Sequence, residues 1–400
     1  REGGEGARAL PHLIRAAHRA VGVTALEESI AYLEACNALL DEIPEEAMAI
    51  EQRHQARLKV LSDLVRQYVA VGELQKALDV SKQVDLLTLP DEGPALDRRH
   101  QLMLDRARAL YLKGRFEEAM AAFEKFDSAA QSDSNVMNTI DAAAGYAASL
   151  GKLGKSEDAL EYLSSAIERH EAALGPSVNS GLYMSRAYRT LGNCALEAGE
   201  FDLAAVHLKR ALEIASEANA PEQSLEALNS LAALRFFRGD LGGAVVEFRS
   251  ALKVAEQWDF TQHRTMLLQN LGEALWNQGE GAESTRMLER SETLARYVGM
   301  DGILAESFRI RAEIQLSQES ISEAEVFARQ AVDAADATGA PRFQAGAQLA
   351  LARALLAQEQ AGSDGPNGAG RSALQLAASL FAKSGQAETA EEIRAELAER

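Results

Sequence analysis

Residues 188–212 read YRTLGNCALEAGEFDLAAVHLKRAL, and residues 228–252 read LNSLAALRFFRGDLGGAVVEFRSAL. Residues 268–292, LQNLGEALWNQGEGAESTRMLERSE, align with both segments without a gap at an offset of 40 residues. In each segment a run with helical spacing of apolar residues is followed by a glycine and then by a second such run. A fixed period of this kind is typical of proteins in which short helix pairs stack on their neighbours. The sequence therefore predicts an all-α array of repeated helix pairs, without β-sheet.

Glycines recur at the predicted turns, and an alanine follows most of them after five residues. A glycine ends a helix readily because it adopts positive φ without a steric penalty. The alanine marks a place where two helices cross too closely for a larger side chain. Glu319 stands where the next glycine is due, and Ser284 replaces one alanine. The glycines are Gly72, Gly114, Gly154, Gly199, Gly239 and Gly279, and the alanines are Ala77, Ala119, Ala159, Ala204, Ala244 and Ala324.

The repeat resembles the tetratricopeptide (TPR) signature, although it is about six residues longer than the usual unit. Its length is similar to that of TPR arrays in bacterial signalling ATPases and regulators and in kinesin-light-chain-like adaptors. The resemblance implies a right-handed superhelical solenoid of about eight to nine antiparallel helix pairs, with the first helix of each pair on the concave side. The residues that carry it are Leu191, Gly192, Gly199, Phe201, Ala204, Leu208, Ala211, Leu271, Gly272 and Gly279.

We expect three regions along the chain. Residues 1–53 form an imperfect helix pair and a connection, residues 54–343 a TPR array of seven helix pairs, and residues 344–400 a degenerate repeat with a flexible loop at 361–370 and a capping helix. The N-terminal region resembles the start of TPR arrays that follow an ATPase module. Because the chain begins with Arg1 rather than Met, we expect a piece of a longer protein or a processed form.

The helix boundaries are less regular at the two ends of the chain. We expect the first pair at 7–20 and 24–40, the last pair at 344–358 and 373–383, and the capping helix at 387–398. Two longer connections are expected inside the array, at 88–96 and 128–138.

Composition narrows the choice of partner and compartment. The 41 Lys and Arg residues are outnumbered by 60 Asp and Glu residues, which gives a formal charge of −19. That charge opposes binding to nucleic acid or to an anionic membrane surface, and it favours a basic partner. No apolar run is long enough to span a membrane. The two cysteines lack a CxxC partner, so we expect a reducing compartment, the cytoplasm.

No motif predicts catalysis, a metal site or a cofactor. Gly154, Lys155 and Ser156 look like the end of a phosphate-binding loop, but the first glycine of that motif is missing and a helix precedes it. The seven histidines show no metal-binding spacing. We interpret Cys36 and Cys194 as small core residues. We therefore expect no enzyme activity.

Positions of the first helices that the fold does not use for packing are the candidate binding residues. Arg and Asn side chains can hold a peptide backbone or a terminal carboxylate, and aromatic side chains can anchor a partner. The aromatic candidates have core packing as an equal alternative. The candidates are Arg108, Tyr111, Arg186, Arg189, Asn193, Asn229, Phe236, Phe237, Gln269, Asn270, Glu273, Trp276, Arg309 and Glu313.

These observations favour a scaffold or adaptor that binds another protein, or a peptide segment of it, in the concave groove. The alternative is the regulatory or sensor TPR region of a larger multidomain signalling ATPase, kinase or transcription regulator. In that case the array contacts other domains of its own full-length chain. An upstream nucleotide-binding domain in the full gene would distinguish the two.

Overall fold

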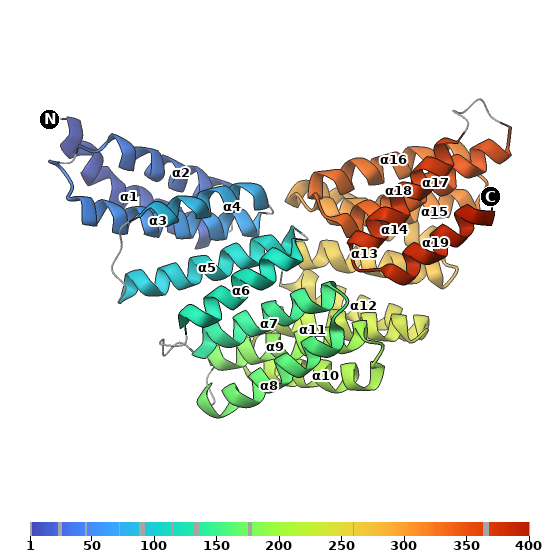
Figure 1. Ribbon diagram of the computed structural model, residues 1–400, viewed down its shortest axis with the longest axis horizontal. Helices are drawn as coiled ribbons and strands as arrows, with labels where there is room; N and C mark the ends of the chain where they lie inside the picture. Colours follow the sequence, from blue (N-terminus) through green and yellow to red (C-terminus); the bar gives the residue numbers. More distant parts are fainter. Residues whose placement is uncertain are drawn as a thin grey trace. The chain divides into compact units, whose positions relative to one another are not determined.

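Figure 1 shows the protein as a computed structural model. It describes residues 2–22, 26–44, 46–71, 73–87, 93–113, 115–130, 136–174, 178–258, 260–362 and 368–399, and within these ranges there is no β-strand. The helices are α1 (Glu2–Gly22), α2 (Leu26–Glu42), α3 (Ile50–Ala70), α4 (Leu74–Gln83), the 3₁₀ helix η1 (Val84–Leu86), α5 (Pro94–Leu112), α6 (Phe116–Ala130), α7 (Val136–Lys152), α8 (Ser156–Leu174), α9 (Val178–Glu197), α10 (Phe201–Glu217), α11 (Pro221–Phe237), α12 (Leu241–Gln257), α13 (Thr261–Asn277), α14 (Gly281–Val298), α15 (Asp301–Ser317), α16 (Ile321–Thr338), α17 (Pro341–Gln360), α18 (Ala369–Lys383) and α19 (Ala387–Glu399).

The helices form successive pairs in which an odd-numbered first helix is followed by an even-numbered second helix, from α1–α2 to α17–α18, with α19 after the last pair. The prediction of an all-α solenoid of helix pairs is therefore confirmed. The turn between the helices of a pair is built as expected. Gly199 and Gly239 have φ of +77° and +79°, and Glu319, where the glycine is missing, still adopts φ of +60°. Gly72 and Gly114 lie outside the described residues.

The small residues pack as the sequence predicts. All six alanines of the five-residue series are completely buried, and so is Ser284, whose hydroxyl donates to the carbonyl oxygen of Gly272 at 2.7 Å. The helices of a pair also approach closely at glycines of the first helix. A Cβ atom on Gly192 would lie 2.6 Å from the Leu208 side chain, and one on Gly272 would lie 2.7 Å from that of Leu288. These contacts leave no room for a larger residue on either side.

The chain divides into two compact units, Arg1–Asn138 and Thr139–Arg400. Within each unit, successive first helices contact each other: α3 contacts α5 in the first unit, and α9, α11, α13, α15 and α17 form a continuous row in the second. Among the described residues, the backbones of successive second helices do not approach each other in this way, and α12 and α14 are joined by ion pairs of long side chains such as Arg249–Glu283. Because the more closely spaced row of a curved stack is its inner side, the first helices line the inner side of the second unit.

Two expected connections are shorter than predicted. Pro94 is the first residue of α5, a position that suits proline because the missing N–H would have no partner there. Helix α6 continues to Ala130 and α7 begins at Val136. Thr24, residues 88–92 and 131–135, and residues 363–367 of the predicted loop at 361–370 lie outside the described residues. The predicted region boundaries at 53/54 and 343/344 stay predictions.

The phosphate-loop-like sequence and the cysteines have the structural roles expected of them. Gly154 and Lys155 form the turn between α7 and α8, with Gly154 at φ of +76°. Both cysteines are buried and unpaired. Burial raises the pKa of the Cys36 thiol to about 11 and that of Cys194 to about 12. Of the described helices, none is both long and apolar enough to cross a membrane.

Candidate functional site

Polar side chains link successive first helices of the second unit. The Nη1 atom of Arg186 on α9 lies 2.9 Å from Oδ1 of Asp141 on the preceding first helix, α7. Three residues later, the Nη2 atom of Arg189 lies 3.3 Å from Oε2 of Glu226 on the next first helix, α11. Residues three apart lie on the same face of a helix. Each first helix can therefore contact the preceding helix with one residue and the following helix with the other.

The same arrangement continues along the row. Asn270 on α13 donates through Nδ2 to Oδ1 of Asn229 on α11 at 2.9 Å. Glu273, three residues after Asn270, lies 2.8 Å from Nη2 of Arg309 on α15. We call this linked set the inner polar stripe. Its members are Asp141, Arg186, Arg189, Glu226, Asn229, Asn270, Glu273, Glu306, Arg309 and Glu313.

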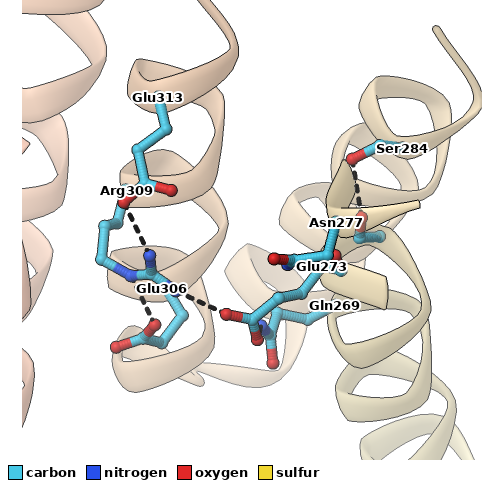
Figure 2. Close-up of polar contacts among 8 residues, drawn as sticks. Gln269, Glu273, Asn277, Ser284, Glu306, Arg309 and Glu313 are labelled. Atoms are coloured by element: carbon cyan, nitrogen blue, oxygen red, sulfur yellow. Dashed lines mark hydrogen bonds and ion pairs between the residues drawn. The ribbon is translucent and has the colours of Figure 1, made fainter. Parts of the chain in front are cut away.

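Arg309 is the centre of the densest polar group in the stripe (Figure 2). Its guanidinium lies 2.8 Å from the carboxylate of Glu306 and 2.9 Å from that of Glu313, in addition to Glu273. Burial lowers the pKa of Arg309, but the three carboxylates together raise it above its ordinary value. Burial, reinforced by the charges of Glu306 and Glu313, raises the pKa of Glu273 despite the neighbouring guanidinium. The guanidinium of Arg309 thus pairs with three carboxylates, and the group formed by these four side chains carries a net negative charge.

Glu226 differs from Glu273 because more cations surround it. Burial raises the pKa of this carboxyl, but the His263 ring, whose Nε2 lies 3.9 Å from Oε1 of Glu226, and the charges of Arg189 and Arg186 outweigh burial and lower the pKa below its ordinary value. Glu226 is therefore ionised at neutral pH. The two halves of the stripe have different charge balances: the half around Glu226 is nearly neutral, and the half around Arg309 is negative.

The remaining candidates of the second unit lie at the edges of the stripe or beneath it. Asn193 is half-buried on α9, and Gln269 is buried and donates to Glu273 at 3.4 Å. Trp276 is half-buried against Leu288, Ile310 and Ile314.

The two phenylalanines at the end of α11 differ in exposure. Phe236 packs against the core formed by α11, α12 and α13, whereas Phe237 is 61% exposed. The structure thus brings together Arg186, Arg189, Asn229, Asn270, Glu273, Arg309 and Glu313 and leaves Phe237 apart from them.

Arg108 and Tyr111 belong to the first unit, on α5. Nη1 of Arg108 lies 2.8 Å from Oδ1 of the buried Asp105, which also receives Arg66 of α3 at 3.6 Å. The Tyr111 ring packs edge-on against Phe116 of α6. The first unit therefore has polar links between first helices of the same kind.

Sequence reasoning missed the acidic partners Asp141, Glu226 and Glu306. The sequence contains a signal for Asp141 and Glu226, because each lies about one repeat length from a candidate arginine. Asp141 lies 45 residues before Arg186, and Glu226 lies 37 residues after Arg189. Such pairs become visible only when the repeats are aligned. In the described part of the chain, no group of three or more His, Cys, Asp or Glu residues could hold a metal ion.

Comparison with known proteins supports the repeat assignment. The tetratricopeptide-repeat family profile matches residues 183–257. No curated protein sequence matches the chain. The structure of a Rap protein complexed with Competence and Sporulation Factor superposes with a TM-score of 0.55 at 13% identity, over 90% of this chain and 98% of that one.

A second solved structure with the same fold is a Signal Transduction ATPase with Numerous Domains from Pyrococcus horikoshii, which has a tetratricopeptide repeat sensor. It superposes with a TM-score of 0.51 at 14% identity, over 94% of this chain and 54% of the Pyrococcus chain. At these identities the likenesses concern the fold. Together with the profile match, they show that residues 183–257 match the tetratricopeptide repeat and that the chain has the helix-pair solenoid fold of such repeats.

Proposed function

We propose that the inner polar stripe binds an extended, basic segment of a partner protein, and that the chain acts as an interaction scaffold. The observation that carries this proposal is the amide pair of Asn229 and Asn270. Their single mutual hydrogen bond uses one Nδ2 hydrogen of Asn270 and one lone pair of Asn229 Oδ1. Because a side-chain amide offers two donors and a two-lone-pair acceptor, the pair retains three N–H hydrogens and acceptor lone pairs on both carbonyl oxygens for a ligand.

A peptide group presents one N–H and one C=O, so the retained amide groups are complementary to the backbone of an extended chain. Binding through the backbone needs no particular side chain in the ligand. The half-buried Asn193 on the neighbouring helix α9 offers a further amide on the same row of helices. The inner position of the row also favours a bound segment, because a concave surface contacts more of a narrow ligand than a flat one.

The charge of the stripe favours a basic segment. Five carboxylates, those of Asp141, Glu226, Glu273, Glu306 and Glu313, face three guanidinium groups, those of Arg186, Arg189 and Arg309. The excess lies around Arg309, so a Lys or Arg side chain of the ligand is expected there. Complementary charge would also speed the encounter with the partner.

The test is a selection from a displayed library of random peptides, followed by affinity measurements with the double variant Asn229→Ala/Asn270→Ala. Removing both amides leaves no unpaired partner, so the fold should tolerate the change. Losing two hydrogen bonds to the ligand should weaken binding by about 30-fold. Selected peptides should be rich in Lys and Arg.

The matched control is Arg249→Ala/Glu283→Ala, which removes a 2.8 Å pair between the second helices α12 and α14. Its affinity should equal that of the wild type. Selected peptides that bind both double variants alike, or a library that yields no binder to the folded protein, would refute the proposal.

A second candidate is the sensor region of a multidomain regulator. The likeness to a signal transduction ATPase whose tetratricopeptide repeats form a sensor favours it. In that role the same stripe would bind a segment of the chain's own full-length protein. Sequencing the full gene tests this candidate, and the absence of an upstream nucleotide-binding domain would count against it.

A further inference from the structure

Two helix turns that are about 230 residues apart in sequence meet within the second unit. One is the turn after α7, with Lys152 and Gly154, and the other is the turn between α18 and α19, with Gly385. A Cβ atom on Gly385 would lie 2.8 Å from the carbonyl oxygen of Lys152 and 3.7 Å from the backbone nitrogen of Gly154. A Cβ atom on Gly154 would lie 3.8 Å from the carbonyl oxygen of Gly385. The two turns are therefore in direct backbone contact.

This contact is not a general property of the turns. Gly199, Gly239 and Gly279 have the same left-handed conformation, and a Cβ atom on any of them would meet nothing within 4 Å. Gly385 is thus restricted twice, by its φ of +82° and by the Lys152 carbonyl group. Only glycine satisfies both conditions while the turns touch.

The contact closes a circuit. Each helix from α8 to α18 contacts the next helix along the chain, up to α19. Helix α7 joins α8 through the Tyr146 and Tyr162 rings, which are 4.6 Å apart, and through the 2.9 Å hydrogen bond between Thr139 and His170. In Figure 1 the α18–α19 turn lies beside the α7–α8 turn. The last helices of the unit, α18 and α19, therefore contact its first helices, α7 and α8, through their turns.

We propose that these two turns form a latch that holds the second unit closed, and that the unit opens there. Elsewhere in the unit, neighbouring helices share buried apolar side chains, such as those of the core shared by α11, α12 and α13. Across the latch, the described residues form no hydrogen bond or ion pair. The ammonium group of Lys152 points to Glu197 of α9, with which it pairs. Individual van der Waals contacts are weak, so the latch is the first contact to break.

The latch controls access to the inner side of the unit. A chain segment that runs through the inside of a closed circuit of helices enters from the side only when the circuit is broken. A ligand that binds better to one of the two states shifts the population towards that state. The latch itself does not depend on the proposed function, since its opening can be measured without any ligand.

The experiment measures the distance between spin labels on opposite sides of the latch by pulsed electron paramagnetic resonance. The labels are attached at Glu157→Cys on α8 and Glu388→Cys on α19, both of which are exposed. The buried Cys36 and Cys194 should remain unlabelled. The unmodified latch should give one narrow, short distance distribution.

Gly385→Ala should shift this distribution to longer distances and broaden it. The matched control is Gly279→Ala, which imposes the same left-handed strain, with φ of +90°, but meets nothing within 4 Å. It should leave the distribution unchanged. A broad, long distribution in the unmodified latch overturns the proposal. So does a Gly385→Ala distribution equal to that of the control.

A second measurement covers the case in which Gly385→Ala disturbs folding of α19. The spin-labelled protein with Gly385 intact is titrated with urea, and its helix content is followed by circular dichroism. Because the latch is the first contact to break, the label distance should lengthen at urea concentrations that leave the helix content unchanged. A distance that changes only together with the helix content overturns the latch.

Discussion

Replacing Arg309 by methionine tests whether the inner polar stripe holds the array together. Methionine keeps most of the side-chain volume but removes the cation that pairs with Glu273, Glu306 and Glu313. Removing one partner of a buried ion pair costs about 3–5 kcal/mol. The Arg309 side chain is only 18% exposed, but the carboxylates are a quarter to a third exposed, and solvent reduces the cost. We expect the free energy of unfolding to fall by about 2–3 kcal/mol.

The loss of unfolding free energy in Arg309→Met should be smaller at acid pH than at neutral pH. Burial already raises the pKa of Glu273, and without Arg309 that pKa rises further. A carboxyl group whose pKa is higher in the folded state binds more protons there, so acid favours folding of the variant. The deficit is complete at neutral pH, where the carboxylates are ionised, and it shrinks as the pH falls towards the unfolded value of about 4.3.

The assay is urea denaturation of both proteins at pH 7.5 and pH 5, followed by circular dichroism. Arg290→Met is the matched control, because Arg290 lies 3.1 Å from Glu256 at the surface, where both side chains are about half exposed. The control should change stability by less than about 0.5 kcal/mol. Equal losses in the two variants, or a loss in Arg309→Met that grows at pH 5, would refute the reasoning.

Other features of the fold give further predictions. Gly239→Val should lower the free energy of unfolding by at least about 1 kcal/mol, because φ is +79° and nothing else lies near the Cβ position; an unchanged denaturation curve would contradict this. Glu319→Gly should raise that free energy by about 0.5–1 kcal/mol by relieving strain at φ of +60°, and a lower midpoint would argue against strain. Gly192→Ala should cost about 1–3 kcal/mol through collision with Leu208, and a double variant with Leu208→Ala should lose less than the sum of the two single losses. Native Cys194 should resist a thiol reagent at pH 8, because burial raises its pKa to about 12, and fast labelling would show that α9 is packed differently.

The fold could be predicted because each repeat solves the same local steric problem. A turn that needs positive φ selects Gly199 and Gly239, and a close helix crossing selects Ala204 and Ala244. These requirements recur at nearly fixed spacing, so one sequence is enough to align them. Even Glu319 follows the rule, since the surrounding repeat imposes the backbone conformation on a residue that does not prefer it.

The candidate site was less predictable because its partners come from different repeats. Sequence shows that Arg186 and Asn270 lie on a first helix, but not that their partners are Asp141 and Asn229. The separations between partners vary from 36 to 45 residues, because connections differ in length. Trp276 shows a second limit: an aromatic residue near the end of a helix fits a core and a surface equally well by pattern.

The links between first helices also have a consequence for how the array can evolve. Arg189 of α9 is matched to a carboxylate on the next first helix, and Arg309 of α15 to a carboxylate on the preceding one. A deletion of the two pairs α11–α14 would keep the 40-residue period and put Glu306 in the place of Glu226, but it would put Asn193 in the place of Glu273, so Arg309 would lose one of its carboxylates. Repeats of the same shape are therefore not interchangeable here, and charge restricts the order in which duplicated or shuffled units can survive.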